Sequence, residues 1–560
     1  MTRLRPIKAP RGGSAAGSGG THRTEPAEPA PGPAHLHEAL ARAPDASTPV
    51  VDGNLLSALR ADLTRAGFTV DGVADRLGPL AASALNREQP VLARLSTAAA
   101  TDACGVLIAL FTLGETVTSA AVDLALPTLG VGGAVALRLV RAASGQVRAV
   151  CDLRPYGEDR GGGSGSGSGS GTGPASRGHD WWVASDLGEL QTGSVLRPDH
   201  VLGIGGASMT LASWTVRRPV DRALDLGTGC GVQALHLSSH ATRVVVTDIS
   251  ERARDYALFN AALNRIELDV RVGDMLEPVA GQQFSLVVSN PPFVITPRVD
   301  GVTRYEYRDG GRAGDALVRS LVREVGAVLE PGGVAQFLGN WEVPRGRSWR
   351  AVWGEWLEGV GLDAWVVQRD TQDPAEYAEL WSRDGGVLPG TGEHHRLIAA
   401  WLRDFAARDV ESIGFGVVTL QRPHGGRDPW RDLAEVTGPV AAALGPTVEA
   451  GLRARTWLAE HDDDDVLAVA WSCAPDVTEE RYGRPGAEHP NVIRFRQGGG
   501  LQREVRADTV LAAYLGVADG ELTARAALDA IAELVGADAS TVRAELTPRL
   551  RDLVADGFLL

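Results

Sequence analysis

The spacing of apolar and polar residues changes several times along the chain. From residue 52 to residue 141 apolar side chains recur every three or four positions, the period of an amphipathic helix. This pattern predicts a mainly helical unit over residues 49–160, ending in a short strand or hairpin at 147–157. After Val201 strand and helix patterns alternate, which predicts a parallel sheet with helices on both faces.

We assign this alternating part to an α/β domain of the Rossmann-like kind over residues 179–424. Seven strands are expected, at 222–227, 243–249, 269–274, 284–290, 333–341, 364–369 and 415–422. Residues 371–412 are too long for a simple connection and read as two helices inserted beyond the minimal fold.

Residues 425–560 are expected to form a C-terminal α+β region. Within it, 492–506 alternates like a hairpin, and the acidic run 462–465 reads as a solvated turn. Residues 507–560 carry helix patterns that resemble a winged-helix module. Such modules bind DNA in some proteins and only mediate contacts in others, and here we favour contacts.

Two segments have a composition that does not support a packed core. Residues 1–48 are rich in Pro, Gly, Ala and charged residues, and we expect a disordered tail because few large apolar side chains are available to offset the ordering entropy. Residues 161–178 are rich in glycine and serine. They are either a linker between domains or the long loop of a hairpin, and the strand-like residues 180–185 favour the loop.

Charge and cysteine usage limit the possible functions. The net charge of −15 disfavours a non-specific nucleic-acid binder, although a local basic patch remains possible. The four cysteines show no paired spacing, so no metal site is expected. We find no apolar targeting segment at the N-terminus and no apolar run of about 20 residues, the length a membrane helix needs. A cytoplasmic protein without membrane contact is therefore predicted.

The first motif that carries chemistry is ALDLGTGCG, which joins a predicted strand to a helix. It contains Asp225, Gly227, Thr228, Gly229 and Gly231. Glycine allows the backbone to turn tightly and a ligand to approach closely, and the helix that follows presents free N–H groups. A glycine-rich turn alone is weak evidence and also suits a dinucleotide. An acid inside the strand, two residues before the first glycine, is more typical of methyltransferases.

Two further acids end the next two predicted strands. Asp248, followed by Ile249, can accept hydrogen bonds from both ribose hydroxyls of an adenosine, and Asp274, followed by Met275, would lie beside the adenine. Carboxyl ends of parallel strands meet at one edge of the sheet, where ligands bind in open α/β folds. Three acids at three such ends predict an adenosine-containing ligand.

The deciding motif is SNPPF at the end of the fourth predicted strand, with Asn290, Pro291, Pro292 and Phe293. An amino group conjugated to a carbonyl or a ring is a poor nucleophile. The Asn290 side-chain oxygen and the Pro291 carbonyl can accept its N–H bonds and stabilise the positive charge that develops as a methyl group arrives. The prolines restrict the backbone, and Phe293 offers a flat face for stacking.

The stretch from residue 224 to residue 295 resembles the class I amino-methyltransferases with an Asn-Pro-Pro-aromatic motif. Within that class it is similar to release-factor glutamine methyltransferases and to ribosomal-RNA guanine methyltransferases. The resemblance implies a methyltransferase domain with S-adenosylmethionine as cofactor and transfer of a methyl group to a planar nitrogen. It implies cofactor contacts from Asp225, Gly227, Thr228, Gly229, Gly231, Asp248, Ile249, Asp274, Met275 and Asn290, and an acceptor site formed by Asn290, Pro291, Pro292 and Phe293.

The acceptor stays open between two main classes. Phe293 stands where release-factor enzymes usually have Tyr, and Phe is common in the RNA-directed relatives. An exocyclic base amine in nucleic acid, with RNA favoured, is therefore the first expectation. A glutamine of a translation factor is the alternative, which the acidic charge favours. A small-molecule acceptor and a non-catalytic adenosine-binding scaffold are weaker alternatives.

Overall fold

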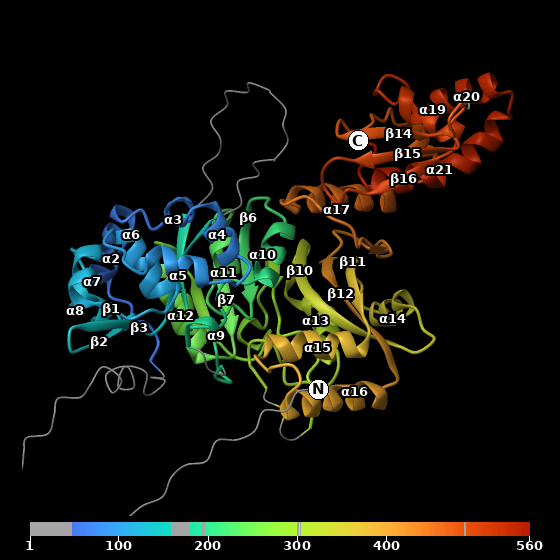
Figure 1. Ribbon diagram of the computed structural model, residues 1–560. Coiled ribbons are helices and arrows are strands. Elements are labelled where there is room, and N and C mark those ends of the chain that lie inside the picture. Colours follow the sequence, from blue (N-terminus) through green and yellow to red (C-terminus); the bar gives the residue numbers. More distant parts are fainter. Residues whose placement is uncertain (1–46, 158–179, 193–195, 300–301, 303, 487–488) are drawn as a thin grey trace, which may run out of the picture. The chain divides into compact units, whose positions relative to one another are not determined.

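The structure is a computed structural model that describes residues 47–157, 180–192, 196–299, 302, 304–486 and 489–560 (Figure 1). Among these residues, no single helix is long and apolar enough to cross a membrane. One bent pair, α7 (Ser119–Ala125) with α8 (Gly130–Ala136), meets the length and composition criterion together. Both helices bury side chains in the apolar core of the N-terminal part.

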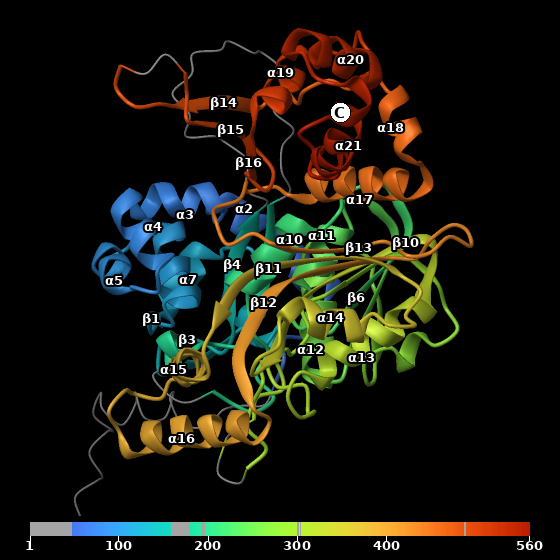
Figure 2. The same ribbon diagram turned by 90° about the vertical axis from the view of Figure 1, so that its right-hand side faces the viewer.

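An eight-stranded sheet forms the centre of the fold, in the order β13-β11-β12-β10-β9-β6-β7-β8 (Figures 1 and 2). Neighbouring strands from β10 to β8 are parallel, while β12 lies antiparallel between β10 and β11. The alternating pattern therefore predicted the α/β class correctly. The strands are β6 (Val220–Leu226), β7 (Ala241–Asp248), β8 (Asp269–Val272), β9 (Phe284–Ser289), β10 (Leu329–Pro344), β11 (Asp363–Gln372), β12 (Val410–Gln421) and β13 (Arg431–Glu435).

The sheet has one strand more than the seven that the sequence predicts. The additional strand, β13, pairs in parallel with β11 at the edge of the sheet and lies beyond residue 424, the predicted end of the domain. Three of its five residues are charged, and none of its side chains is fully buried. An edge strand of this kind shows no apolar alternation, so the sequence pattern did not reveal it.

Helices cover both faces of the sheet, because alternate residues of a strand point to opposite faces. Leu224 and Leu226 of β6 lie in one core with α13 and α14, whereas Ala223 lies in another with α10, α11 and α17. These elements are α10 (Gly206–Trp214), α11 (Val232–Leu237), α12 (Glu251–Leu263), α13 (Ala316–Glu324), α14 (Trp349–Trp356) and α17 (Gly445–Glu460), with short turns η2 (Glu277–Val279) and η3 (Val325–Val328).

The N-terminal part is mainly helical and shares its core with the α/β domain. Leu59 and Phe68 belong to the same apolar cluster as Tyr256 and Phe259 of α12. The elements are α2 (Gly53–Arg65), α3 (Val70–Leu77), α4 (Pro79–Leu85), α5 (Val91–Thr97), α6 (Ala103–Leu107), η1 (Ile108–Thr112), α7 and α8, and a small sheet of β1 (Val117–Thr118), β3 (Gln146–Ala149) and β2 (Val140–Ala143).

Strands β4 (Asp152–Gly157) and β5 (Asp180–Ser185) flank the Gly/Ser-rich segment and pair antiparallel along their whole length. The predicted linker or loop, 161–178, lies outside the described residues, as do residues 1–46 of the predicted tail. The paired flanks favour the loop alternative, because a hairpin brings the two ends of the segment together.

Two asparagines of α12 complete the outer edge of β5. The Asn260 side chain accepts from the N–H of Ala184 and donates to its carbonyl, both at 2.8 Å, and Asn264 makes the same pair of bonds with Trp182 at 2.9 and 2.8 Å. Asn260 Nδ2 also donates to the carbonyl of Cys230, at 2.8 Å. One amide therefore connects β5 to the glycine-rich turn after β6.

The C-terminal region contains the hairpin expected at 492–506, formed by β15 and β16, and β14 adds a further strand to it. The acidic run 462–465 differs from the expected turn, because it begins a helix. The Asp462 side chain accepts from the N–H groups of Asp464 and Asp465 as an N-cap. The elements are α18 (Asp463–Ala468), β14 (Val477–Tyr482), β15 (Val492–Gln497), β16 (Glu504–Ala507), α19 (Thr509–Val517), α20 (Ala524–Val535) and α21 (Ala539–Ala555).

Helices α15 (Pro374–Asp384) and α16 (Gly392–Ala407) form the two-helix insertion expected between β11 and β12. Strand β11 runs in the same direction as β10, so its end at Gln372 lies at the carboxyl edge of the parallel strands. Figure 2 shows both helices beyond the edge of the sheet where β11 ends and β12 begins. The insertion thus lies on the edge of the sheet that the sequence assigns to ligands.

Candidate active site

The first part of the site is the turn between β6 and α11. Gly227, Gly229 and Gly231 have φ angles of +72°, +55° and +89°, a region that side chains rarely adopt. A Cβ atom at Gly227 or Gly229 would meet no other atom within 4 Å. The backbone conformation therefore requires glycine, and open space adjoins the turn.

Asp225 lies buried beneath this turn. Its Oδ2 accepts from Thr228 Oγ1 at 2.6 Å and from the N–H of Ala234 at 3.0 Å, whereas Oδ1 has no hydrogen-bond partner among the described residues. Burial raises the pKa of Asp225 to about 7. A carboxyl group with these properties suits a positively charged partner, which would restore its ionised form.

Asp248 ends β7 and faces the same turn. Its Oδ2 accepts from the N–H of Gly229 and its Oδ1 from the N–H of Ser250, both at 2.9 Å. Burial raises the pKa of Asp248. An ionised carboxylate has about four acceptor positions. The two backbone bonds fix its orientation and leave acceptor capacity for ligand hydroxyls.

The ends of β7 and β8 are joined by a bond from the N–H of Gly273 to the carbonyl of Asp248, at 2.9 Å. This brings Asp274 and Ile249 to the same edge, and both are exposed, Ile249 to 63%. Met275 has a φ of +46° and packs against the core that contains α13 and α14. Asp274 and Ile249 can therefore border a ligand, whereas Met275 shapes the turn.

Asn290 follows β9 directly beside the glycine-rich turn. Ser289 pairs with Leu226 across the parallel strands, and its hydroxyl donates to the Leu226 carbonyl at 2.7 Å. Asn290 Oδ1 is buried and has no hydrogen-bond partner in the part of the chain that the structure describes. Pro291 and Pro292 carry no N–H group that could satisfy it. An orphaned acceptor at this position can accept the N–H donors of a ligand.

The loop after Asn290 is held between two other segments. The Phe293 backbone forms an isolated bridge with Asp309, and the N–H of Val294 donates to the Arg308 carbonyl at 2.8 Å. The Phe293 ring is half-buried, and its centroid lies 6.4 Å from that of Trp381 on α15. The structure thus brings the predicted stacking residue against the insertion.

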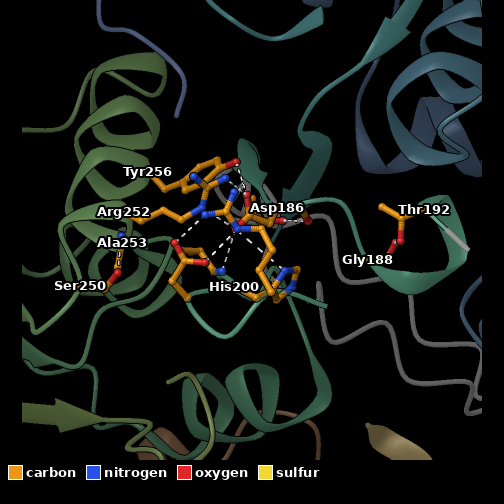
Figure 3. A network of polar contacts seen from close by, with 12 residues as sticks. Asp186, Gly188, Thr192, His200, Ser250, Arg252, Ala253 and Tyr256 are labelled. Atoms are coloured by element: carbon orange, nitrogen blue, oxygen red, sulfur yellow. Dashed lines mark hydrogen bonds and ion pairs between the residues drawn. The ribbon is translucent and has the colours of Figure 1, made fainter. Parts of the chain in front are cut away.

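A polar network that no sequence motif indicates supports the site (Figure 3). Asp186 accepts from Arg252 Nε and from the Tyr256 hydroxyl, both at 2.8 Å, and from the N–H of Val201 at 2.9 Å. Burial opposes ionisation of Asp186, but the bonds and charge of Arg252, together with the bonds from Val201 and Tyr256, lower its pKa overall. The network fixes the first turn of α12, which begins shortly after Asp248.

A second segment without a motif, residues 305–309, lies against the loop after Asn290, where Asp309 forms a bridge with Phe293. The N–H of Glu306 donates to the Pro198 carbonyl at 2.9 Å. Burial raises the pKa of Glu306, with further contributions from the charges of Asp199 and Asp248. A run of aromatic and charged residues, YEYRD, is the only sequence signal of this segment.

The described residues contain no group of three or more His, Cys, Asp or Glu side chains placed to hold a metal ion. The groups at the site are instead carboxylates on separate strand ends, an unpaired amide oxygen and a glycine-rich turn. This set suits an organic ligand with hydroxyl, ammonium and amine donors.

Comparison with known families gives a match for this part of the chain. The segment that matches the model of the methyltransferase small domain is residues 204–346. It includes the glycine-rich turn and Asn290, and it ends before the α15–α16 insertion. Residues 65–150 match a domain of unknown function, DUF7059.

Several curated methyltransferases are similar to the chain. The release factor glutamine methyltransferase of Koribacter versatilis is 37% identical over 171 residues, which is 28% of this chain and 58% of the relative. That of Mycolicibacterium smegmatis is 34% identical over 198 residues, 33% of this chain and 59% of the relative. The ribosomal RNA small subunit methyltransferase C of Alcanivorax borkumensis is 28% identical over 151 residues, 27% of this chain and 39% of the relative.

The chain therefore spans less than two thirds of the length of each of these relatives. The resemblance to release-factor and ribosomal-RNA methyltransferases that residues 224–295 indicate is confirmed. The relatives belong to both acceptor classes that the sequence leaves open.

Proposed function

We propose that the chain is an S-adenosylmethionine-dependent N-methyltransferase acting on a planar amino or amide nitrogen. The observation that carries the proposal is the buried, unpaired Oδ1 of Asn290, beside the glycine-rich turn of a methyltransferase domain. A cytoplasmic location remains a prediction from the sequence.

The residues around the turn fit S-adenosylmethionine. The unpaired Oδ1 of Asp225 and its pKa of about 7 suit the ammonium group of the cofactor's amino-acid part. The open space beside Gly227 and Gly229 admits a ligand close to the backbone. The fixed carboxylate of Asp248 suits ribose hydroxyls. The residues that would hold the cofactor are Asp225, Gly227, Thr228, Gly229, Gly231, Asp248, Ile249 and Asp274. Met275 shapes the turn beside them, and Asn290 acts mainly on the acceptor.

When bound, the cofactor supplies a methyl carbon on a positively charged sulfur, which is open to attack by a nitrogen lone pair. Asn290 Oδ1 and the Pro291 carbonyl would accept the N–H bonds of the target, draw its lone pair out of conjugation and stabilise the developing positive charge. The target nitrogen then loses one proton to solvent. Pro291 and Pro292 hold these acceptors rigidly, so little reorganisation is needed.

An exocyclic base amine in RNA is the first acceptor class we propose. It rests on Phe293, which stands where the RNA-directed relatives commonly have phenylalanine. The ring remains half-buried, so part of its surface is open to a base.

A glutamine amide of a translation factor is the second, and the acidic net charge of −15 favours it. A negatively charged protein repels the phosphates of a nucleic acid. Each arginine of α21 is paired with a carboxylate: Arg543 with Asp529, Arg549 with Asp508 and Arg551 with Asp463. This pairing also favours a contact role for residues 507–560.

The test is incubation with methyl-labelled S-adenosylmethionine and a cell extract fractionated into RNA, DNA, protein and small molecules. Label in RNA supports the first class, and label in protein supports the second. Wild-type protein that binds the cofactor and transfers no label to any fraction would contradict the proposed activity.

A further inference from the structure

The α15–α16 insertion contacts the loop that follows β9 through three side chains. The N–H of Ile295 donates to the Tyr377 hydroxyl at 2.9 Å, and Trp401 Nε1 donates to the Ile295 carbonyl at 2.7 Å. The ring of Trp381 meets Phe293 at an interplanar angle of 70°. All three side chains belong to the insertion, which lies outside the residues that match the methyltransferase family.

Tyr377 is the centre of these contacts. It is completely buried, and its hydroxyl also accepts from Asn340 Nδ2 on β10 at 2.9 Å. Its ring packs against Phe405 of α16 and Phe415 of β12, with centroids 5.6 and 5.5 Å away. A side chain fixed by this many partners holds the Ile295 N–H in one position, five residues after Asn290.

Arg308 fastens the other side of the same loop to the insertion. Its carbonyl accepts from the N–H of Val294 at 2.8 Å, and its guanidinium donates to Asp384 Oδ2 of α15 at 2.9 Å. The side chain is buried and lies over the Tyr305 ring, 4.6 Å from its centroid. The loop therefore has one fixed wall, to which α15 contributes Tyr377, Trp381 and Asp384.

The degree of burial separates the roles of these aromatic side chains. Tyr377 and Trp401 are buried completely, whereas Phe293 and Trp381 are half-buried and lie side by side. Partly exposed rings set at a steep angle offer a face and an edge to a flat group. Such a group would lie within reach of Asn290, three residues before Phe293.

We infer that the α15–α16 insertion forms one wall of the acceptor site. Trp381 is the specificity-determining residue that contacts the planar group of the acceptor, and Tyr377 and Trp401 are positioning residues that act through Ile295. The inference rests on the proposed function, because the acceptor is defined by it.

Hydrogen exchange tests the positioning role of Tyr377 and Trp401 and needs no acceptor. Tyr377→Phe and Trp401→Phe each remove one polar contact of Ile295 and keep an aromatic ring. Peptides that cover residues 291–298 should exchange several-fold faster in both variants, while peptides from β6 and the glycine-rich turn should stay unchanged. Exchange in 291–298 identical to that of the wild type in both variants would overturn the positioning role.

The role of Trp381 in specificity is tested with the fraction of the cell extract that the wild type labels. Trp381→Ala should lower kcat/KM for that fraction by at least 10-fold, or transfer label to fractions that the wild type leaves unlabelled, while cofactor affinity from calorimetry stays within a few-fold. Trp381→Phe keeps a flat ring and should retain more activity than Trp381→Ala. It also provides a test if the alanine variant fails to fold. Leu388→Ala, an exposed residue between α15 and α16, is the matched control.

The proposed function and the role of the insertion predict different failures. A wild-type protein that labels nothing contradicts the proposed function. If the wild type labels its acceptor, and Trp381→Ala and Trp381→Phe equal it in kcat, KM and pattern of label, the insertion does not form a wall of the acceptor site. The proposed function is then unaffected.

Discussion

Asp248 Oδ2 accepts a hydrogen bond from the backbone N–H of Gly229, 2.9 Å away. This bond joins the end of β7 to the glycine-rich turn after β6, so the two parts of the proposed cofactor site are held as one unit. Because Ser250 donates to the other oxygen, the carboxylate is oriented before any ligand arrives.

Asp248→Ala should therefore weaken binding of S-adenosylmethionine. Loss of bonds to a charged group costs about 1.5–3 kcal/mol, which corresponds to an affinity about 10- to 150-fold lower. Titration calorimetry measures it. Asp269→Ala, at the opposite end of β8, is the control and should bind as the wild type does. Unchanged affinity in Asp248→Ala would refute its assignment to the ribose.

The affinity for the cofactor should depend on pH through Asp225. Burial raises the pKa of this carboxyl to about 7 in the ligand-free protein, and a bound ammonium group would lower it again. Binding then releases a proton, so affinity is highest above pH 7 and falls as the pH drops through 7. The Asp225→Asn variant, which cannot titrate there, should show a flatter profile between pH 6 and pH 8. A parallel slope in both proteins would assign the dependence to another group.

Asn260→Ala should reduce the stability of the fold. The change leaves the N–H and carbonyl of Ala184 and the carbonyl of Cys230 without their partner, and unsatisfied buried groups cost about 1–3 kcal/mol each. We expect a loss of more than about 2 kcal/mol in urea unfolding. Asn264→Ala, at a half-buried position, should cost less. Equal, small losses of stability in both variants would mean that the backbone groups at the edge of β5 find other hydrogen-bond partners.

Shortening residues 161–173 should leave the melting temperature nearly unchanged. Strands β4 and β5 pair up to Gly157 and Asp180, so the two ends of the segment are already close together. Loop length enters the closure entropy only logarithmically. A large fall in melting temperature after shortening to a few residues would show that the segment has a structural role of its own.

The sequence predicts well where local pattern carries the information. Buried strands such as Phe284–Ser289 are mostly apolar, and the glycines of the turn are required by positive φ angles, so both are recognisable from residue type alone. Asn290 is recognisable because two prolines and an aromatic residue follow it at a strand end.

The remaining features depend on contacts between residues far apart in the chain. Asp186 and Arg252 are 66 residues apart, and Ile295 and Trp401 are 106 residues apart. No local period encodes such pairs, so the sequence indicates the two inserted helices but not their contact with the loop. Strand β13 was missed for a related reason, since its pairing with β11 is provided by the backbone.

The proposed methyl transfer depends most directly on the side chain of Asn290. If its side-chain oxygen polarises the target nitrogen, the contribution is made in the transition state and not in cofactor binding. Asn290→Ala should keep cofactor affinity within a few-fold and lower turnover about 100-fold or more, the loss expected when one preorganised transition-state partner is removed. Asn290→Asp keeps an acceptor oxygen and should retain more activity than alanine. The decisive measurement is the single-turnover rate of methyl transfer to the fraction that the wild type labels. We expect the wild type to be fastest, the aspartate variant slower and the alanine variant slowest, whereas equal rates in all three would show that Asn290 does not polarise the target nitrogen.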